Sequence, residues 1–144
     1  MKKILLLDFD GVLHADGDAL FSKLDSLEKY LLNMPNVDIV ISSSWRESYF
    51  FDELKKFFPV NLQGRIIGIT PTSNGSFERG GRQREIEAFL DAAALNESNS
   101  SWIALDDMGY LFDHECSYLI LVNPELGFCE RDGQQLMAWY ESGE

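Results

Sequence analysis

The hydrophobic positions of the chain fall into short unbroken runs that alternate with longer segments of helical periodicity. The first run, residues 4–7, consists of aliphatic side chains with no polar alternation, which is typical of a strand covered on both faces of a parallel sheet. Runs of similar length predict further strands at residues 37–41, 65–69, 102–105 and 118–122.

Amphipathic segments between these runs predict helices. Leucines recur at helical spacing from position 20 to position 31, and Pro35 marks the end of that helix. Comparable patterns predict helices over about residues 19–33, 48–58, 82–93 and 132–141. This alternation predicts an α/β fold, a three-layer α/β/α sandwich with a central parallel sheet and right-handed crossovers.

The length and composition set the scale of the molecule. The 144 residues, of which 45% are hydrophobic, predict a single domain that spans residues 1–144. We expect a loop that crosses the mouth of a site at 70–81 and a surface loop at 96–101. The chain has no apolar run of about 18 residues, so we expect a cytoplasmic protein without a membrane partner.

Two aspartates, Asp8 and Asp10, come directly after the first predicted strand, and Gly11 follows them. Ligands of open α/β sheets bind beyond the carboxyl ends of the strands. Two carboxylates this close repel one another, and a hard cation such as Mg²⁺, which prefers oxygen ligands, relieves the repulsion. The alternative is that both residues cap a turn or a helix.

Polar residues also follow the second and fourth predicted strands. Ser42, Ser43 and Ser44 come after the second strand, and Asp106 and Asp107 come after the fourth. Carboxyl ends of parallel strands meet at one edge of the sheet, so the two acidic pairs are expected to face one another there.

The net charge is −12, from 24 acidic and 12 basic residues. This balance argues against the broad electropositive surface that nonspecific nucleic-acid binding requires. A polyanionic substrate must therefore be held locally, and the few arginines near the acidic positions carry more information than they would in a basic protein.

Four features resemble, in order and spacing, the motifs of the haloacid dehalogenase (HAD) superfamily of phosphatases. They are DFDGVL at 8–13, the serine cluster, an arginine that opens a helix, and the pair DD after the fourth strand. More narrowly, SSSWR, RQREIEAFL and LDD resemble the HAD-like domain of the Swiss Army Knife RNA repair proteins. The resemblance covers nearly the whole chain.

The resemblance implies roles for the first two acids. Asp8 would be the nucleophile that attacks phosphorus and becomes an aspartyl phosphate. Asp10 would be the general acid toward the leaving oxygen and then the base for water, while its backbone carbonyl binds Mg²⁺.

The resemblance also assigns roles to the serine and arginine motifs. Ser43 would hydrogen-bond the transferring phosphoryl group, and Ser42 or Ser44 would do so if the motif is aligned one residue earlier or later. Arg82 would stabilise the phosphoryl charge, and Arg84 is the alternative residue for this role. Of the last pair, Asp107 is the preferred Mg²⁺ ligand, because it lies further from the apolar core of the strand. Asp106 would bind the metal beside it, orient a water molecule or orient Arg82.

Two more residues have open interpretations. Arg46 would clamp a second phosphate or a substrate backbone, or else form a surface ion pair with Glu47 or Asp52. His14 would line the site, although a histidine with satisfied hydrogen bonds is the preferred reading.

Selective HAD enzymes commonly carry a cap domain after the first or second motif, and neither interval of this chain has room for one. An open site suits a phosphate at the end of a large molecule. The sequence thus favours a Mg²⁺-dependent phosphomonoesterase that acts on RNA or DNA termini or on nucleotides. The alternatives are a small-metabolite phosphatase with the 70–81 loop as a lid, and a noncatalytic binding module.

Overall fold

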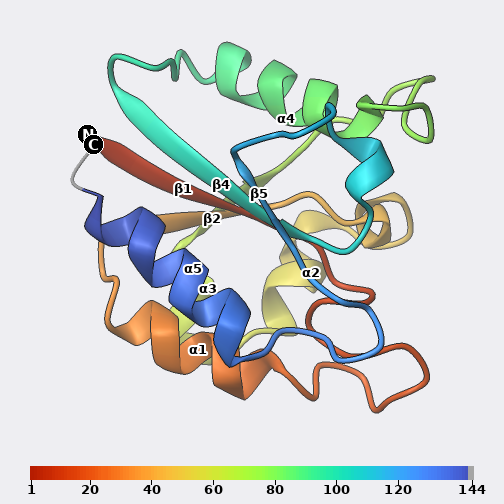
Figure 1. Ribbon diagram of the computed structural model, residues 1–144, viewed down its shortest axis with the longest axis vertical. Coiled ribbons are helices and arrows are strands. Elements are labelled where there is room, and N and C mark those ends of the chain that lie inside the picture. The colour runs from red at the N-terminus through yellow and green to blue at the C-terminus, as the bar shows by residue number, and fades with distance from the viewer. Residues whose placement is uncertain (143–144) are drawn as a thin grey trace.

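The computed structural model describes residues 1–142, and its centre is a five-stranded sheet (Figure 1). Every pair of neighbouring strands is parallel, and the strand order is β3-β2-β1-β4-β5. This confirms the predicted α/β sandwich with a parallel sheet. The strands are β1 (Lys2–Leu7), β2 (Val37–Ile41), β3 (Ile66–Ile69), β4 (Ser100–Asp106) and β5 (Leu119–Leu121).

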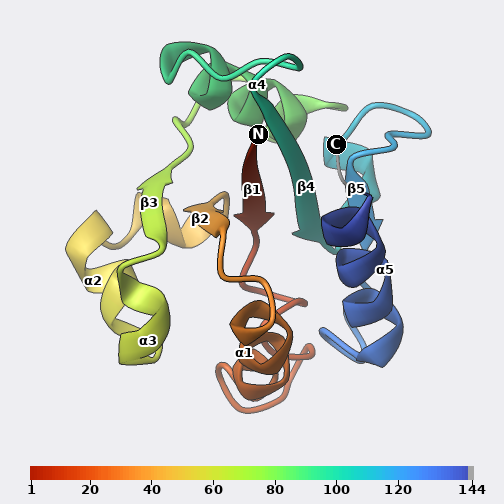
Figure 2. The ribbon, with the colours of Figure 1, turned by 90° about the vertical axis from the view of Figure 1, so that its left-hand side faces the viewer.

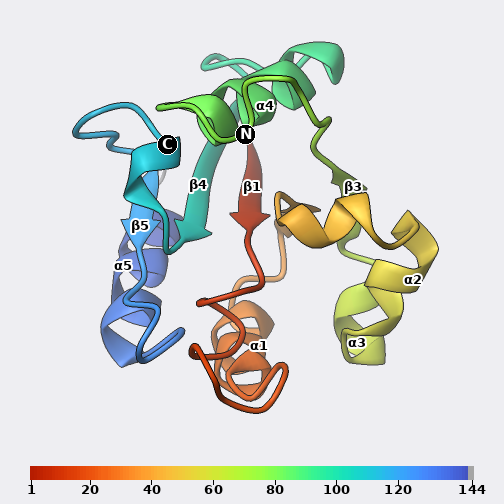
Figure 3. The same cartoon turned by 90° about the vertical axis from the view of Figure 1, so that its right-hand side faces the viewer.

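Helices cover the two faces of the sheet unequally. In Figures 2 and 3, α4 lies alone on one side, and α1, α2, α3 and α5 lie on the other. The helices are α1 (Leu24–Leu32), α2 (Phe51–Lys56), α3 (Val60–Gln63), α4 (Gly81–Ala92) and α5 (Glu130–Glu141), with 3-10 turns η1 (Ser44–Glu47) and η2 (Gly109–Leu111).

The central strand β1 explains why its apolar run has no alternation. Leu5 and Leu7 pack into the core beneath α1 and α5, whereas Ile4 and Leu6 pack into the core beneath α4. All four side chains are fully buried, so each face of the strand requires an aliphatic residue.

The first helix is shorter than predicted. It begins at Leu24 instead of residue 19, and Leu20 is 62% exposed. The leucine spacing therefore extends further toward the N-terminus than the helix does. Residues 15–23 form turns instead, and Phe21 has a φ of 61°, which a helix does not allow. The segment before α1 is thus a structured loop.

The predicted helix over 48–58 is shorter in the structure, where α2 spans Phe51–Lys56. Phe50 is the N-cap of α2 and is 82% exposed, so it does not belong to the apolar face as predicted. Pro59 lies beyond the end of α2, as predicted, and is the N-cap of α3, a short helix that the sequence pattern did not predict. The predicted surface loop at 96–101 is also wrong at its end, because Ser100 and Ser101 pair with β1 as part of β4.

The strand register aligns four polar residues along the carboxyl edge of the sheet. Leu7 pairs with both Ile41 and Leu105, and Ile41 pairs with Ile69. The next residue of each strand therefore forms a row in the order Thr70, Ser42, Asp8, Asp106. All four side chains are buried. The site is built around this row.

Within residues 1–142, no helix has the length and apolar character needed to cross a membrane.

Candidate active site

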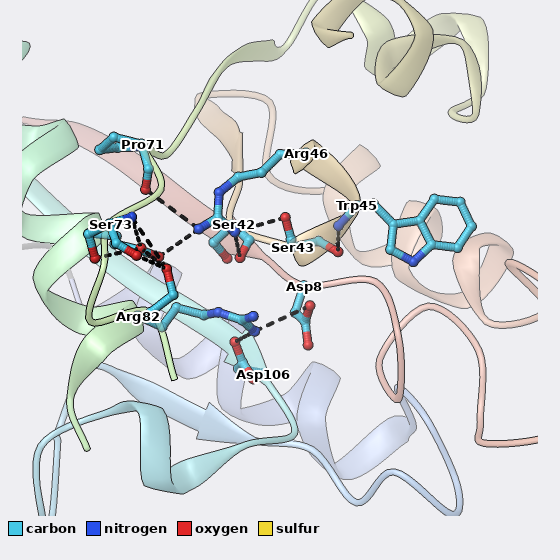
Figure 4. A network of polar contacts seen from close by, with 11 residues as sticks. Asp8, Ser42, Ser43, Trp45, Arg46, Pro71, Ser73, Arg82 and Asp106 are labelled. Carbon is cyan, nitrogen blue, oxygen red and sulfur yellow. Dashed lines mark hydrogen bonds and ion pairs between the residues drawn. The ribbon is translucent and has the colours of Figure 1, made fainter. Parts of the chain in front are cut away.

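Arg82 joins the first and fourth strands of the chain at this edge (Figure 4). It lies in the first turn of α4, and its Nη1 donates a 2.8 Å hydrogen bond to Asp106 Oδ2 and lies 3.4 Å from Asp8 Oδ1. All three side chains are less than a tenth exposed. A buried guanidinium between two carboxylates is a rigid, preorganised positive charge.

The carboxylates form a compact cluster of oxygen ligands. One oxygen from each of Asp8, Asp106 and Asp107 lies within 4.8 Å of the other two. Asp106 has both oxygens occupied, because Oδ2 accepts from Arg82 and Oδ1 accepts from the backbone N–H of Met108 at 2.9 Å. Asp107 is only half-buried, and its role as the direct metal ligand stays a prediction.

The absence of a side chain at Gly11 leaves space for the carboxylate of Asp107. The φ of Gly11 is +77°, and a Cβ at this position would collide with the carboxylate of Asp107. Both the backbone conformation and the close approach require glycine here. The turn after β1 and the end of β4 are thereby packed against each other.

The charges of the cluster do not balance, since it holds three carboxyl groups and one guanidinium. Burial, reinforced by the charge of Asp106, raises the pKa of Asp8 well above its ordinary value, against the opposing effect of Arg82. Burial also raises the pKa of Asp107, which shares a hydrogen bond with Asp8. Burial alone would lower the pKa of Arg82, but the charges of Asp106 and Asp8 outweigh it and raise that pKa. A divalent cation held by oxygen ligands would neutralise the excess charge.

Arg82 and Arg84, the two candidates for the arginine motif that opens a helix, have different surroundings in the structure. Arg82 lies in the acid cluster, whereas Arg84 is half-exposed and lies 3.5 Å from Glu78 Oε2. Arg84 also donates to the backbone carbonyl of Arg79. It therefore lies outside the cluster, on another face of α4.

The surface ion pair of Arg46 with Glu47 or Asp52 was wrong, whereas a contact of Arg46 with a phosphate or a substrate backbone stays a prediction. Its side chain is only 3% exposed and forms a 2.6 Å ion pair with Glu85. It also donates to the backbone carbonyls of Ser42 and Ser43, at 3.0 and 2.9 Å. Burial lowers the pKa of Arg46, against the effect of Glu85. Arg46 thus fixes the turn after β2.

Glu85 also fastens the loop after β3. One carboxylate oxygen binds Arg46, and the other accepts from the backbone N–H and hydroxyl of Ser73 and from the hydroxyl of Ser76. Arg46 reaches the carbonyl of Pro71 in the same loop. The loop is therefore folded back on α4. Among the described residues, its side-chain bonds run to this network, within the loop and to Arg84, and none runs to the acid cluster.

Asp10 lies outside the cluster, in a separate arrangement. Its side chain is 61% exposed, and it accepts from His14 Nε2 at 2.9 Å and from Trp45 Nε1 at 3.0 Å. His14 is buried and also accepts the backbone N–H of Phe21, so it is the satisfied histidine that the sequence favoured. Sequence reasoning missed Trp45, which lies 35 positions from Asp10 and next to the predicted serine motif.

The serines occupy the turn between β2 and η1. Ser42 stands in the row beside Asp8, and its buried hydroxyl has no hydrogen-bond partner among the described residues, as is also true of Thr70. The hydroxyl of Ser43 accepts the backbone N–H of Trp45 at 3.2 Å, which leaves its own proton free to donate. Ser44 is half-buried in the first turn of η1. The register of the serine motif stays a prediction.

Comparison with known families gives one result. Residues 4–132 match the family described as the HAD domain in Swiss Army Knife RNA repair proteins, whereas comparison with curated proteins and with solved structures gave no match. The matched segment runs from β1 into α5 and includes the entire acid cluster, and it confirms the resemblance seen in the motifs. The chain belongs to the family of HAD domains found in Swiss Army Knife RNA repair proteins.

Proposed function

We propose that this protein is a Mg²⁺-dependent phosphomonoesterase that works through an aspartyl phosphate on Asp8. One observation carries the proposal: Asp8, Asp106 and Asp107 offer oxygens within 4.8 Å of one another, and Arg82 lies beside them. Membership of a HAD family supports a phosphatase-like role. Two structural caps would not account for a buried cluster with an uncompensated negative charge.

In the first step, a carboxylate oxygen of Asp8 attacks the phosphorus atom, and the bond to the leaving oxygen breaks. Arg82, fixed by Asp106, stabilises the charge spread over the phosphoryl oxygens. Ser43 is the proposed hydroxyl donor to one of these oxygens, with Ser42 as its neighbour in register. Asp10 gives its proton to the leaving oxygen, so the product departs as a neutral hydroxyl compound.

In the second step, water attacks the phosphorus of the aspartyl phosphate. Asp10, now a carboxylate, accepts the proton of the water, and the acyl phosphate bond breaks to release inorganic phosphate and restore Asp8. The two exchanges at Asp10 cancel, so the net reaction is hydrolysis of one phosphate ester.

The residues that would hold Mg²⁺ are Asp8, Asp107 and the backbone carbonyl of Asp10. Carboxylate and carbonyl oxygens are the ligands this ion prefers, and the excess negative charge fits it. When bound, the ion neutralises charge on the phosphoryl oxygens and on the carboxylates. Asp106 is proposed to orient Arg82, because its Oδ2 accepts a 2.8 Å hydrogen bond from that guanidinium.

We propose a nucleic-acid end or a nucleotide as the substrate. The segments between Asp10 and Arg82 form α1, η1, α2, α3, two strands and connecting loops, so they leave the site uncapped. The name of the family refers to RNA repair proteins, which supports this class of substrate. The alternative of a metabolite phosphatase needs the 70–81 loop as a lid, and Glu85 fastens that loop to α4.

A substrate panel tests the proposal. We expect phosphate release from end-phosphorylated RNA or DNA, or from nucleotides, in Mg²⁺ and not in EDTA. Faster release from sugar phosphates would favour the metabolite phosphatase instead. If no phosphate is released from any of these compounds in Mg²⁺, the chain is a noncatalytic binding module.

A further inference from the structure

We infer that His14 and Trp45 are positioning residues that hold the carboxyl group of Asp10 for proton transfer to the leaving group. The inference rests on the proposed function for the role of Asp10. It concerns residues that act through Asp10 and that need not touch the phosphate.

Two donors are aimed at the two oxygens of one exposed carboxylate. His14 Nε2 lies 2.9 Å from Asp10 Oδ1, and Trp45 Nε1 lies 3.0 Å from Asp10 Oδ2. An exposed aspartate normally exchanges between rotamers in solvent, whereas this one is bound on both sides to aromatic side chains. The chain has thus fixed the direction of a carboxylate that still faces solvent.

The proton arrangement of His14 follows from its other contact. The backbone N–H of Phe21 donates to His14 Nδ1 at 3.2 Å, so Nδ1 carries no proton in this arrangement. The ring proton of neutral His14 must then lie on Nε2, where it is donated to Asp10. The loop before α1 therefore selects the tautomer that supports Asp10.

Phe21 adopts an unusual conformation to make this contact. It is a bulky residue with a φ of 61°, a conformation that L-residues other than glycine seldom adopt. Its ring packs edge-on against Phe9, Trp45 and His14, at centroid distances of 5.7, 5.4 and 5.8 Å. The aromatic packing holds the strained residue in place, and this combination is typical of functional sites.

The two donors suit the acid step in particular. A proton is transferred only to an oxygen within hydrogen-bond reach, so a carboxyl group held in one orientation by the N–H groups of His14 and Trp45 is preorganised for that step. Each carboxyl oxygen has a second lone pair, so both contacts can persist while Asp10 carries the proton. Loss of either donor should let the carboxyl group rotate away from the leaving oxygen, and this matters most for leaving groups that need a proton.

Substituted phenyl phosphates test this dependence. Trp45→Phe removes the indole N–H and keeps an aromatic ring. For the least acidic phenol it should lower kcat/KM on the order of tenfold, the typical loss of one hydrogen bond to a charged group. For p-nitrophenyl phosphate, whose leaving group needs little protonation, the change should be less than about twofold. The plot of rate against leaving-group acidity should therefore steepen.

Matched variants separate positioning from packing. His14→Ala should steepen the same plot, and His14→Gln, which retains an N–H donor, should restore part of the original slope. Tyr49→Phe is the control, because Tyr49 stacks on Trp45 at 5.4 Å but removal of its hydroxyl leaves both donors to Asp10 intact. An equal loss with every phenol would contradict the inference, and so would faster turnover by the variants.

A second measurement does not depend on turnover. The ¹⁵N spectrum of the histidine side chains, with the His14 signal assigned from its loss in His14→Gln, should show the Nε2–H tautomer. In Asp10→Asn the Nε2 proton should shift. A His14 proton on Nδ1, or a His14 signal unchanged in Asp10→Asn, would overturn the inference. If the wild type hydrolyses no phosphate ester, the proposed function fails and this spectrum alone decides whether His14 donates to Asp10.

Discussion

Arg82 donates a 2.8 Å hydrogen bond to Asp106 although the two residues are 24 positions apart in the chain. The bond links the first turn of α4 to the end of β4, and it points the guanidinium at Asp8, which lies 3.4 Å away. Asp106 thus acts on phosphate only through Arg82 in this account, and Arg82 is the cation that the phosphoryl group meets.

Replacing Arg82 should therefore be costly. We expect Arg82→Ala to lower the rate of phosphate release by on the order of a hundredfold or more, as the loss of one preorganised transition-state donor typically does. Arg82→Lys keeps the charge and should recover only part of the rate, because it lacks the planar fork. Arg84→Ala is the control and should cost little. The rate of phosphate release by each folded variant measures this. A large loss for Arg84→Ala together with a normal rate for Arg82→Ala would show that the arginine motif was assigned to the wrong residue.

Asp8→Asn should abolish turnover and yet stabilise the protein in EDTA. The amide is not a nucleophile, and it removes one negative charge from a cluster of three carboxylates. Mg²⁺ should raise the Tm of the wild type, since it binds only the folded site, and should raise the Tm of Asp8→Asn much less. Thermal denaturation with and without Mg²⁺ measures both effects. A lower Tm for Asp8→Asn in EDTA would argue against the uncompensated charge.

The metal-free protein should also lose stability as the pH rises. Burial and the charge of Asp106 raise the pKa of Asp8 in the folded state, so between the unfolded and the folded pKa the native protein binds the extra proton. Stability falls with pH wherever the native state holds more protons. The difference in free energy of unfolding, wild type minus Asp8→Asn, should become more negative as pH rises above about 4, the ordinary value for aspartate. Urea titrations in EDTA across this range give the slope, and a difference that does not vary with pH would refute it.

The pair of Arg46 and Glu85 should control stability. Arg46→Met leaves the Glu85 carboxylate buried without its cation, which should lower the free energy of unfolding by about 3–5 kcal/mol. Arg84→Ala breaks an exposed pair and should cost about 1 kcal/mol or less. Adding Glu85→Gln to Arg46→Met removes the unpaired charge and should recover part of the loss. Urea denaturation compares the variants. Similar losses for Arg46→Met and Arg84→Ala would mean that the buried pair is not a stabilising element.

The order of strands and helices was predictable because each strand is a buried apolar run and parallel strands deliver their following residues to one edge. This logic placed Asp8, Asp106 and Asp107 at one edge from the sequence, and the structure brings them together. The helix boundaries were less predictable. The leucine periodicity extended the predicted helix back to Leu20, but Phe21 has a positive φ and the helix starts only at Leu24.

The hydrogen-bond and ion-pair partners of Arg46 and Asp10 were not predictable from the sequence. Arg46 meets Glu85 across 39 positions, and Trp45 meets Asp10 across 35, so neither pair leaves a local pattern in the sequence. The ion pairs predicted for Arg46 used acids close in sequence, because sequence proximity was the only guide. Strand register, which the sequence does not specify, was needed to set Ser42 beside Asp8 and Thr70 beside Ser42.

The most direct test of the account is to trap the phosphoryl group on Asp8. Asp10→Asn lacks the base for the second step, whereas p-nitrophenyl phosphate has a leaving group that departs with little need of an acid, so the aspartyl phosphate should accumulate. After acid quench and proteolysis, mass spectrometry of the Asp10→Asn protein in Mg²⁺ should find one added phosphoryl group on Asp8, and none in the Asp8→Asn/Asp10→Asn double variant. Phosphate release by the wild type with undiminished release by Asp8→Asn, and no phosphoryl group on Asp8, would contradict the account.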